Sequence, residues 1–169
     1  MFSYETLDAI ADSINPVFGV AALLMPWLKH FRSIRQGRIR QALAFDGMTL
    51  ASVAIAYALQ ALDIAGSLWP RAGLDFSTHM AVFVAIAASL WQHGVVWRWT
   101  VVALGLAYAA LMRVQDYHSA MDIISTSVAI LPLLVLLWWR AARSLRSVES
   151  GTSSYAAQRG ARTLNIPHE

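Results

Sequence analysis

The sequence predicts an all-α membrane protein, a transmembrane helix bundle that crosses the bilayer about five times. Of its 169 residues, 57% are hydrophobic and 14% are charged, whereas a soluble domain carries about 25% charged residues. The apolar residues also form long runs, not the periodic stripes of helices that cover a soluble core. Composition and run length therefore both favour membrane spans.

Five apolar runs account for the spans, and they cover residues 14–28, 42–62, 76–91, 95–112 and 118–139. Several are shorter than the roughly 20 residues that cross a bilayer core. Their polar ends should therefore continue the helices into a protected cavity, or the bilayer should thin locally. The first helix can also extend back through residues 1–13, where four polar residues fall on one helical face: Glu5, Asp8, Asp12 and Asn15. Such a stripe is more often the solvated face of an entry helix.

One membrane domain is expected over residues 1–147, followed by a flexible cytoplasmic tail over residues 148–169. The tail is rich in Ser, Gly, Thr and Arg, a composition that is typical of mobile segments. The absence of cysteine excludes disulfides, a thiolate nucleophile and a zinc–thiolate centre. The basic residues flank the apolar runs, so membrane orientation explains them better than nucleic-acid binding does.

The orientation follows from the basic residues, of which there are 13. In an alternating five-span arrangement, all but two of them fall on one face: Lys29, Arg32, Arg35, Arg38, Arg40, Arg98, Arg140, Arg143, Arg146, Arg159 and Arg162. The other face receives only Arg71 and Arg113. The positive-inside rule makes the basic face cytoplasmic, with the N-terminus outside and the C-terminus inside. The expected location is the plasma (inner) membrane.

Titratable residues open two of the runs on the predicted outer face. Ser77, Thr78 and His79 begin the third run, and His118 and Asp122 begin the fifth. Ionisable groups at membrane depth are costly and usually mark function. This set suits phosphoryl transfer, which needs a nucleophile, an acid for the leaving oxygen and donors around the phosphoryl oxygens.

Each candidate residue has a role in that chemistry. His118 is the candidate nucleophile, and Asp122, one turn later, would fix its tautomer. His79 would protonate the leaving group and then activate water, and Arg113 would bind the phosphate bidentately. Further phosphate contacts are expected from Arg71 and from the backbone N–H groups around Ser77 and Thr78.

These residues resemble the type 2 phosphatidic acid phosphatase superfamily of membrane lipid phosphatases and phosphotransferases. That family has a Pro-Ser-Gly-His motif at the outer start of one span, and Ser77 and His79 match its serine and histidine. A histidine and an aspartate four residues on begin its final span, as His118 and Asp122 do here. The resemblance covers roughly residues 76–135. It implies an outward-facing site, a phosphohistidine intermediate on His118, a phosphorylated lipid substrate and no metal or other cofactor.

The chain departs from the family at the phosphate cradle, and two alternative functions stay open. The family's upstream lysine motif is absent, and four residues intervene between Arg113 and His118 where the family usually has five. One alternative is a metal-dependent membrane hydrolase with His79, His118 and Asp122 as ligands. The other is a non-catalytic relative that binds an anionic lipid or a protein. For Asp122 itself, the alternative to catalysis is stabilisation of a helix N-terminus.

Overall fold

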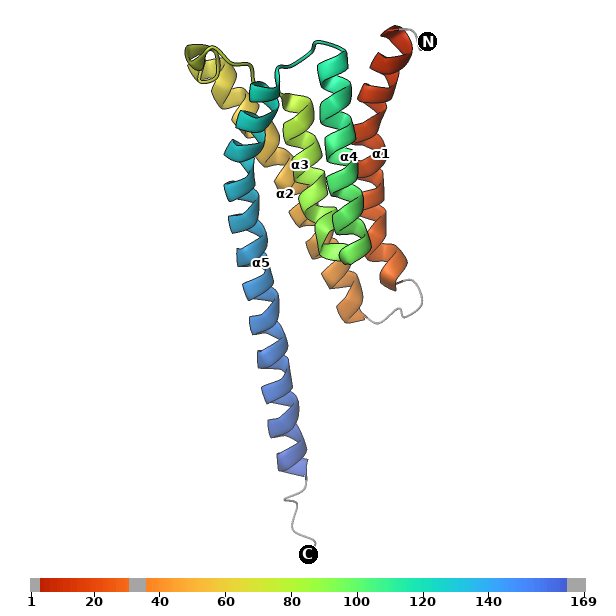
Figure 1. Ribbon diagram of the computed structural model, residues 1–169. Helices are drawn as coiled ribbons and strands as arrows, with labels where there is room; N and C mark the ends of the chain where they lie inside the picture. Colours follow the sequence, from red (N-terminus) through yellow and green to blue (C-terminus); the bar gives the residue numbers. More distant parts are fainter. Residues whose placement is uncertain (1–3, 31–35, 164–169) are drawn as a thin grey trace, which may run out of the picture. The chain divides into compact units, whose positions relative to one another are not determined.

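The computed structural model is all-helical over the residues that it describes, which are 4–30 and 36–163 (Figure 1). Five α-helices follow one another along the chain: α1 (Tyr4–His30), α2 (Gln36–Gly66), α3 (Thr78–Leu90), α4 (Val95–Val114) and α5 (Ala120–Thr163). Short 3-10 turns, η1 (Pro70–Ala72) and η2 (Trp91–His93), flank α3. The prediction of an all-α fold is confirmed.

Four helices of the described chain are long and apolar enough to cross a membrane. Their candidate spans are Ala9–Leu28, Ile39–Gly66, Val95–Val114 and Ala120–Arg143. Large apolar side chains on these helices are exposed, among them Leu24, Leu50, Leu106 and Leu133. A soluble protein rarely exposes so much contiguous apolar surface. The chain is therefore a multi-pass membrane protein.

The third predicted span, residues 76–91, differs from the other four. Its α-helix, α3, has 13 residues and is about 20 Å long at about 1.5 Å per residue, short of a hydrocarbon core of about 30 Å. Eight of those residues are buried, and α3 packs against α1, α2 and α4. A helix that is apolar all round belongs inside a bundle. The five predicted helices are thus present, but α3 is an enclosed short helix.

Small residues bring the helices of the bundle close together. Ala22 of α1, Ala56 of α2 and Ala81 of α3 are fully buried. At Gly105 of α4, an added Cβ would lie 3.0 Å from a ring carbon of Phe83 in α3. Lipid tails are as apolar as leucine side chains, so membrane helices gain most from close van der Waals packing.

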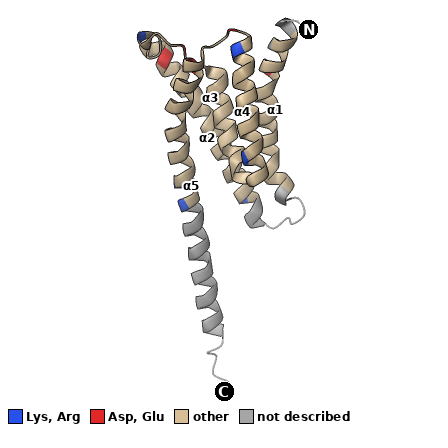
Figure 2. Cartoon of the chain, viewed as in Figure 1, with Lys and Arg blue, Asp and Glu red and all other residues tan. Residues whose placement is uncertain are grey.

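Charged residues of α1 to α4 gather near the helix ends, as Figure 2 shows. The end that carries the start of α3 and α5 and the end of α4 is called the His118 end. Arg71 and Arg113 lie at this end, and contacts that involve His79, Tyr108 and Asp122 join its helices. At the opposite end, the indole N–H of Trp27 donates to Asp46 Oδ2 at 2.7 Å, and the hydroxyl oxygens of Thr49 and Ser89 form a hydrogen bond of 2.7 Å.

The C-terminal part of the chain forms a compact unit of its own, and the boundary at residue 147 stays a prediction. Residues 1–135 form one compact unit, and residues 136–169 form a second one. Within α5 the helix continues to Thr163, past the start of the predicted tail. In the second unit the guanidinium of Arg143 lies 3.7 Å from the ring of Trp139, one helical turn away. Residues 164–169 lie outside the described residues, and the flexibility and cytoplasmic location of the tail stay predictions.

Candidate functional site

The start of α5 is built by a reciprocal cap between Ser119 and Asp122. The backbone N–H of Asp122 donates to the Ser119 hydroxyl at 3.1 Å, and the backbone N–H of Ser119 donates to Asp122 Oδ2 at 2.7 Å. The Ser119 carbonyl accepts the first helical bond, from Ile123, at 3.3 Å. This is a capping box, which satisfies backbone donors that a helix start leaves unpaired.

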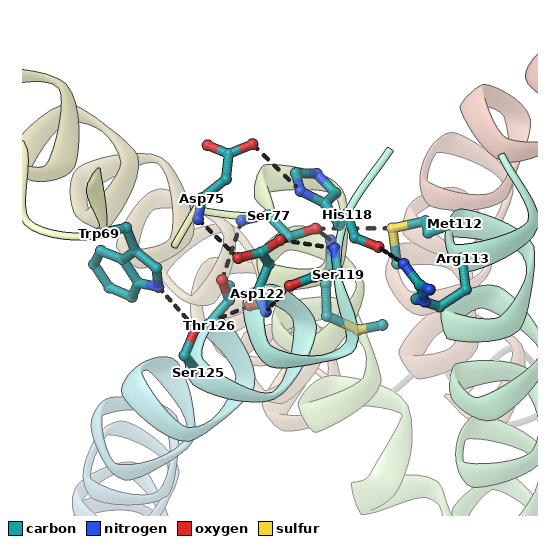
Figure 3. Close-up of polar contacts among 11 residues, drawn as sticks. Trp69, Asp75, Ser77, Met112, Arg113, His118, Ser119, Asp122, Ser125 and Thr126 are labelled. Carbon is teal, nitrogen blue, oxygen red and sulfur yellow. Dashed lines mark hydrogen bonds and ion pairs between the residues drawn. The ribbon is translucent and has the colours of Figure 1, made fainter. Parts of the chain in front are cut away.

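The second carboxylate oxygen of Asp122 holds a different segment of the chain. Its Oδ1 accepts the backbone N–H of Asp75 at 2.8 Å, so it ties the segment before α3 to the start of α5 (Figure 3). Asp122 is 7% exposed, and both of its oxygens accept backbone donors. Asp122 is therefore a structural acceptor at the helix N-terminus, where a carboxylate is also favoured by the helix dipole.

The predicted hydrogen bond from the His118 imidazole to Asp122 is not what the structure contains. Both oxygens of Asp122 take backbone N–H groups instead, as described above. His118 precedes the N-cap Ser119, while Asp122 lies inside α5, which begins at Ala120. A spacing of four residues aligns two side chains only when both belong to the same helix, so the spacing of this pair does not produce a hydrogen bond between the imidazole and the carboxylate.

The His118 ring faces Asp75. Its Nδ1 lies 3.4 Å from Asp75 Oδ2, an ion-pair distance, and the two side chains are 12% and 70% exposed (Figure 3). Nδ1 is buried and makes no hydrogen bond with any residue that the structure describes. Nδ1 of this mostly buried imidazole therefore faces a carboxylate without a hydrogen bond to it.

The two candidate phosphate-binding arginines differ in their contacts with this histidine. Arg113, in the last turn of α4, donates from Nη1 to the backbone carbonyl of His118 at 3.1 Å, and its side chain is exposed. Arg71 lies in η1, is also exposed, and forms no ion pair or side-chain hydrogen bond with other described residues. Its turn is anchored instead through Trp69, whose indole N–H donates to the Ser125 hydroxyl at 3.0 Å.

Ser77 is an internal residue, and this corrects its predicted role in phosphate binding. It is fully buried and is the N-cap of α3, where its hydroxyl accepts the N–H of Met80 at 3.4 Å. Its own backbone N–H donates to the Thr126 hydroxyl at 3.0 Å. Buried backbone donors are nearly always paired in this way. Thr78, the first residue of α3, is half-buried.

His79 belongs to a second imidazole–carboxylate pair, with a residue of α1. Its Nε2 lies 3.5 Å from Asp12 Oδ1, and the side chains are 47% and 68% exposed. The side-chain amide of Asn15 donates to the His79 carbonyl at 3.0 Å. Asp12 and Asn15 belong to the polar stripe that the sequence suggested was a solvated face, and they also contact α3. The side chains of Glu5 and Asp8 lie outside the described residues.

The candidate metal ligands are not arranged as a metal site. Within residues 4–30 and 36–163, no three His, Asp or Glu side chains are grouped so that they could hold a metal ion. His79 and His118 each face a different carboxylate, Asp12 and Asp75. The geometry gives two separate imidazole–carboxylate pairs, an arrangement suited to proton transfer and to nucleophilic attack by an oriented imidazole.

Sequence reasoning missed the two carboxylates that pair with the histidines. No local motif identifies Asp75 or Asp12, because each meets its histidine only through packing. The capping role of Asp122 did have a local signal, the pattern Ser119-x-x-Asp122 just before an apolar run. Comparisons with family models, with curated proteins and with solved structures found no match.

Proposed function

We propose that the protein is an integral-membrane lipid phosphatase or head-group phosphotransferase in which His118 is the nucleophile. The observation that carries the proposal is the pairing of a mostly buried imidazole with an exposed cation at one end of a membrane bundle. Arg113 reaches the His118 carbonyl at 3.1 Å, so a phosphate bound by its remaining N–H groups would lie close to the ring. A guanidinium suits that task because its N–H groups match phosphate oxygens in pairs.

The reaction would proceed in two steps. In the first, an imidazole nitrogen of His118 forms a bond to phosphorus while the bond from phosphorus to the leaving oxygen breaks. The leaving oxygen takes a proton from protonated His79, which is 47% exposed and stands at the same end. In the second, water or a lipid hydroxyl gives its proton to His79 and attacks phosphorus, which releases the imidazole. Water completes a phosphatase cycle, and a lipid hydroxyl completes a transferase cycle.

The surroundings of the site support a lipid substrate. The four long apolar helices keep the protein in the bilayer, and the His118 end lies at helix termini, where lipid head groups are found. Candidate substrates are a polyprenyl pyrophosphate, phosphatidic acid or a phosphorylated lipid head group. Only Arg71 and Arg113 of the basic residues stand at the predicted outer face, so the site is proposed to face the periplasm or exterior.

Phosphate release from a panel of lipid phosphates by the purified protein in detergent tests this function. We expect turnover of at least one lipid with and without EDTA, and none by His118→Ala. The matched control is His93→Ala, since His93 belongs to η2 at the opposite end and packs against Phe45. With a substrate that carries a labelled phosphate, the label should become attached to the wild-type protein by an acid-labile, base-stable bond.

The alternatives give different results in the same assay. Loss of turnover with EDTA would favour the metal-dependent hydrolase. Binding of anionic lipid without turnover of any panel member would favour the non-catalytic relative. Wild-type rates in a folded His118→Ala protein would end the assignment of His118 as nucleophile.

A further inference from the structure

We infer that Asp75 is the positioning residue of His118, and that Asp122 fixes the backbone that carries Asp75. This inference rests on the proposed function, because it names the group that orients its nucleophile. The carboxylate that faces the His118 ring belongs to Asp75, with Oδ2 at 3.4 Å from Nδ1. Asp75 lies on the segment between η1 and α3, far from His118 in the sequence.

The backbone around Asp75 is held in place by α5. The N–H of Asp75 donates to Asp122 Oδ1 at 2.8 Å, and the N–H of Ser77 donates to Thr126 Oγ1 at 3.0 Å. Between them, Phe76 is 6% exposed, and its ring meets that of Trp69 edge-on with centroids 4.8 Å apart. The side chain of Asp75 is exposed, but the main chain that carries it is fixed on both sides.

This arrangement gives the Asp75 carboxylate a defined effect on the imidazole. A carboxylate beside Nδ1 favours the tautomer with the proton on Nδ1, which leaves the lone pair of Nε2 free. When Nε2 forms its bond to phosphorus, the ring gains positive charge while Nδ1 keeps its proton. The nearby carboxylate stabilises that charge, as the aspartate of a catalytic triad does. Because Asp75 is 70% exposed, water weakens this interaction.

The other two acids near His118 in the sequence are held in different contacts. Asp122 has both oxygens on backbone N–H groups. Asp116 is exposed in the loop after α4, where its backbone N–H donates to the Arg113 carbonyl at 3.2 Å. Asp116 is therefore the matched control for the loss of a carboxylate at the same end.

Steady-state kinetics with a lipid phosphate test the role of Asp75. We expect Asp75→Asn to lower kcat by about 10- to 100-fold with KM nearly unchanged, a smaller loss than the roughly 10⁴-fold for a buried triad aspartate. Asp75→Glu should recover part of kcat, because it restores the charge, and Asp116→Asn should match the wild type. A wild-type kcat for Asp75→Asn would overturn the inference.

A second measurement does not depend on turnover. Nitrogen-15 NMR of labelled histidine reports the tautomer of His118, whose signals are identified by their loss in His118→Gln. We expect the Nδ1-protonated form in the wild type and in Asp116→Asn, and a mixture of tautomers in Asp75→Asn.

The two measurements separate the inference from the proposed function. A tautomer change on Asp75→Asn in a protein that turns over no lipid phosphate would retain the pairing and reject the function. Normal turnover with no tautomer change in Asp75→Asn would retain the function and reject the positioning role.

Discussion

The backbone N–H of Asp75 donates a 2.8 Å hydrogen bond to the carboxylate of Asp122, across 47 positions of the sequence. The same carboxylate caps α5 through Ser119 at 2.7 Å. One side chain therefore fixes both the start of a membrane helix and the main chain of the acid that faces His118. An aspartate four residues after a histidine therefore serves this chain as a structural junction.

Asp122→Asn should lower both stability and activity. An asparagine keeps one carbonyl oxygen, but its amide nitrogen would face a backbone N–H that the carboxylate now accepts. A buried donor left unpaired costs about 1–3 kcal/mol, so thermal unfolding in detergent should occur at a lower temperature. Ser127→Asn is the control, because the Ser127 hydroxyl only donates to the Ile123 carbonyl within α5. An unchanged unfolding temperature for Asp122→Asn would contradict the structural role of Asp122 as a junction.

The two arginines at the His118 end should differ in their effect on catalysis. Arg113→Ala removes the guanidinium that reaches the His118 carbonyl, and loss of a charge-assisted contact costs about 1.5–3 kcal/mol. We expect kcat/KM to fall by roughly 10- to 150-fold, and Arg71→Ala to have a much smaller effect. A larger loss for Arg71→Ala would place the phosphate beside η1 instead.

Gly105→Ala should destabilise the bundle, and Gly47→Ala should not. Both changes replace a helical glycine and gain up to about 1 kcal/mol of helix propensity. At Gly47 an added Cβ meets nothing within 4 Å, whereas at Gly105 it lies 3.0 Å from the ring of Phe83. Phe83 is 4% exposed and is packed against Phe18 and Tyr108, so it has little room to move. The unfolding temperatures of the two variants are measured in the same detergent. Equal temperatures would show that the Phe83 ring moves to make room for the added methyl group.

Labelling of single cysteines tests which side of the membrane the His118 end faces. The chain contains no native cysteine, so a membrane-impermeant thiol reagent added to intact cells has a clean background. Cysteines at Ala72 and Asp116 should react, and a cysteine at Gln92, on the opposite end in η2, should not. All three positions are exposed. Reaction at Gln92 alone would reverse the proposed orientation.

The membrane class, the number of helices and the gathering of polar residues at helix ends could all be read from the sequence. Long apolar runs are costly to expose to water, so they predict membrane helices. Successive helices run in opposite directions, which places Ser77, His79, Arg113 and His118 at the same end. The capping of α5 is also local, because Ser119 and Asp122 lie within one turn of each other. These features depend on composition and on neighbours in the chain.

Only the tertiary structure decided which groups meet. The enclosure of α3 by α1, α2 and α4, the contact of Asp12 with His79 and the contact of Asp75 with His118 all join residues that are far apart in the sequence. The spacing of His118 and Asp122 suggested a different partner because it assumes a shared helix, and α5 begins between them. Packing fixes which segment lies against a helix, and periodicity alone carries no such information.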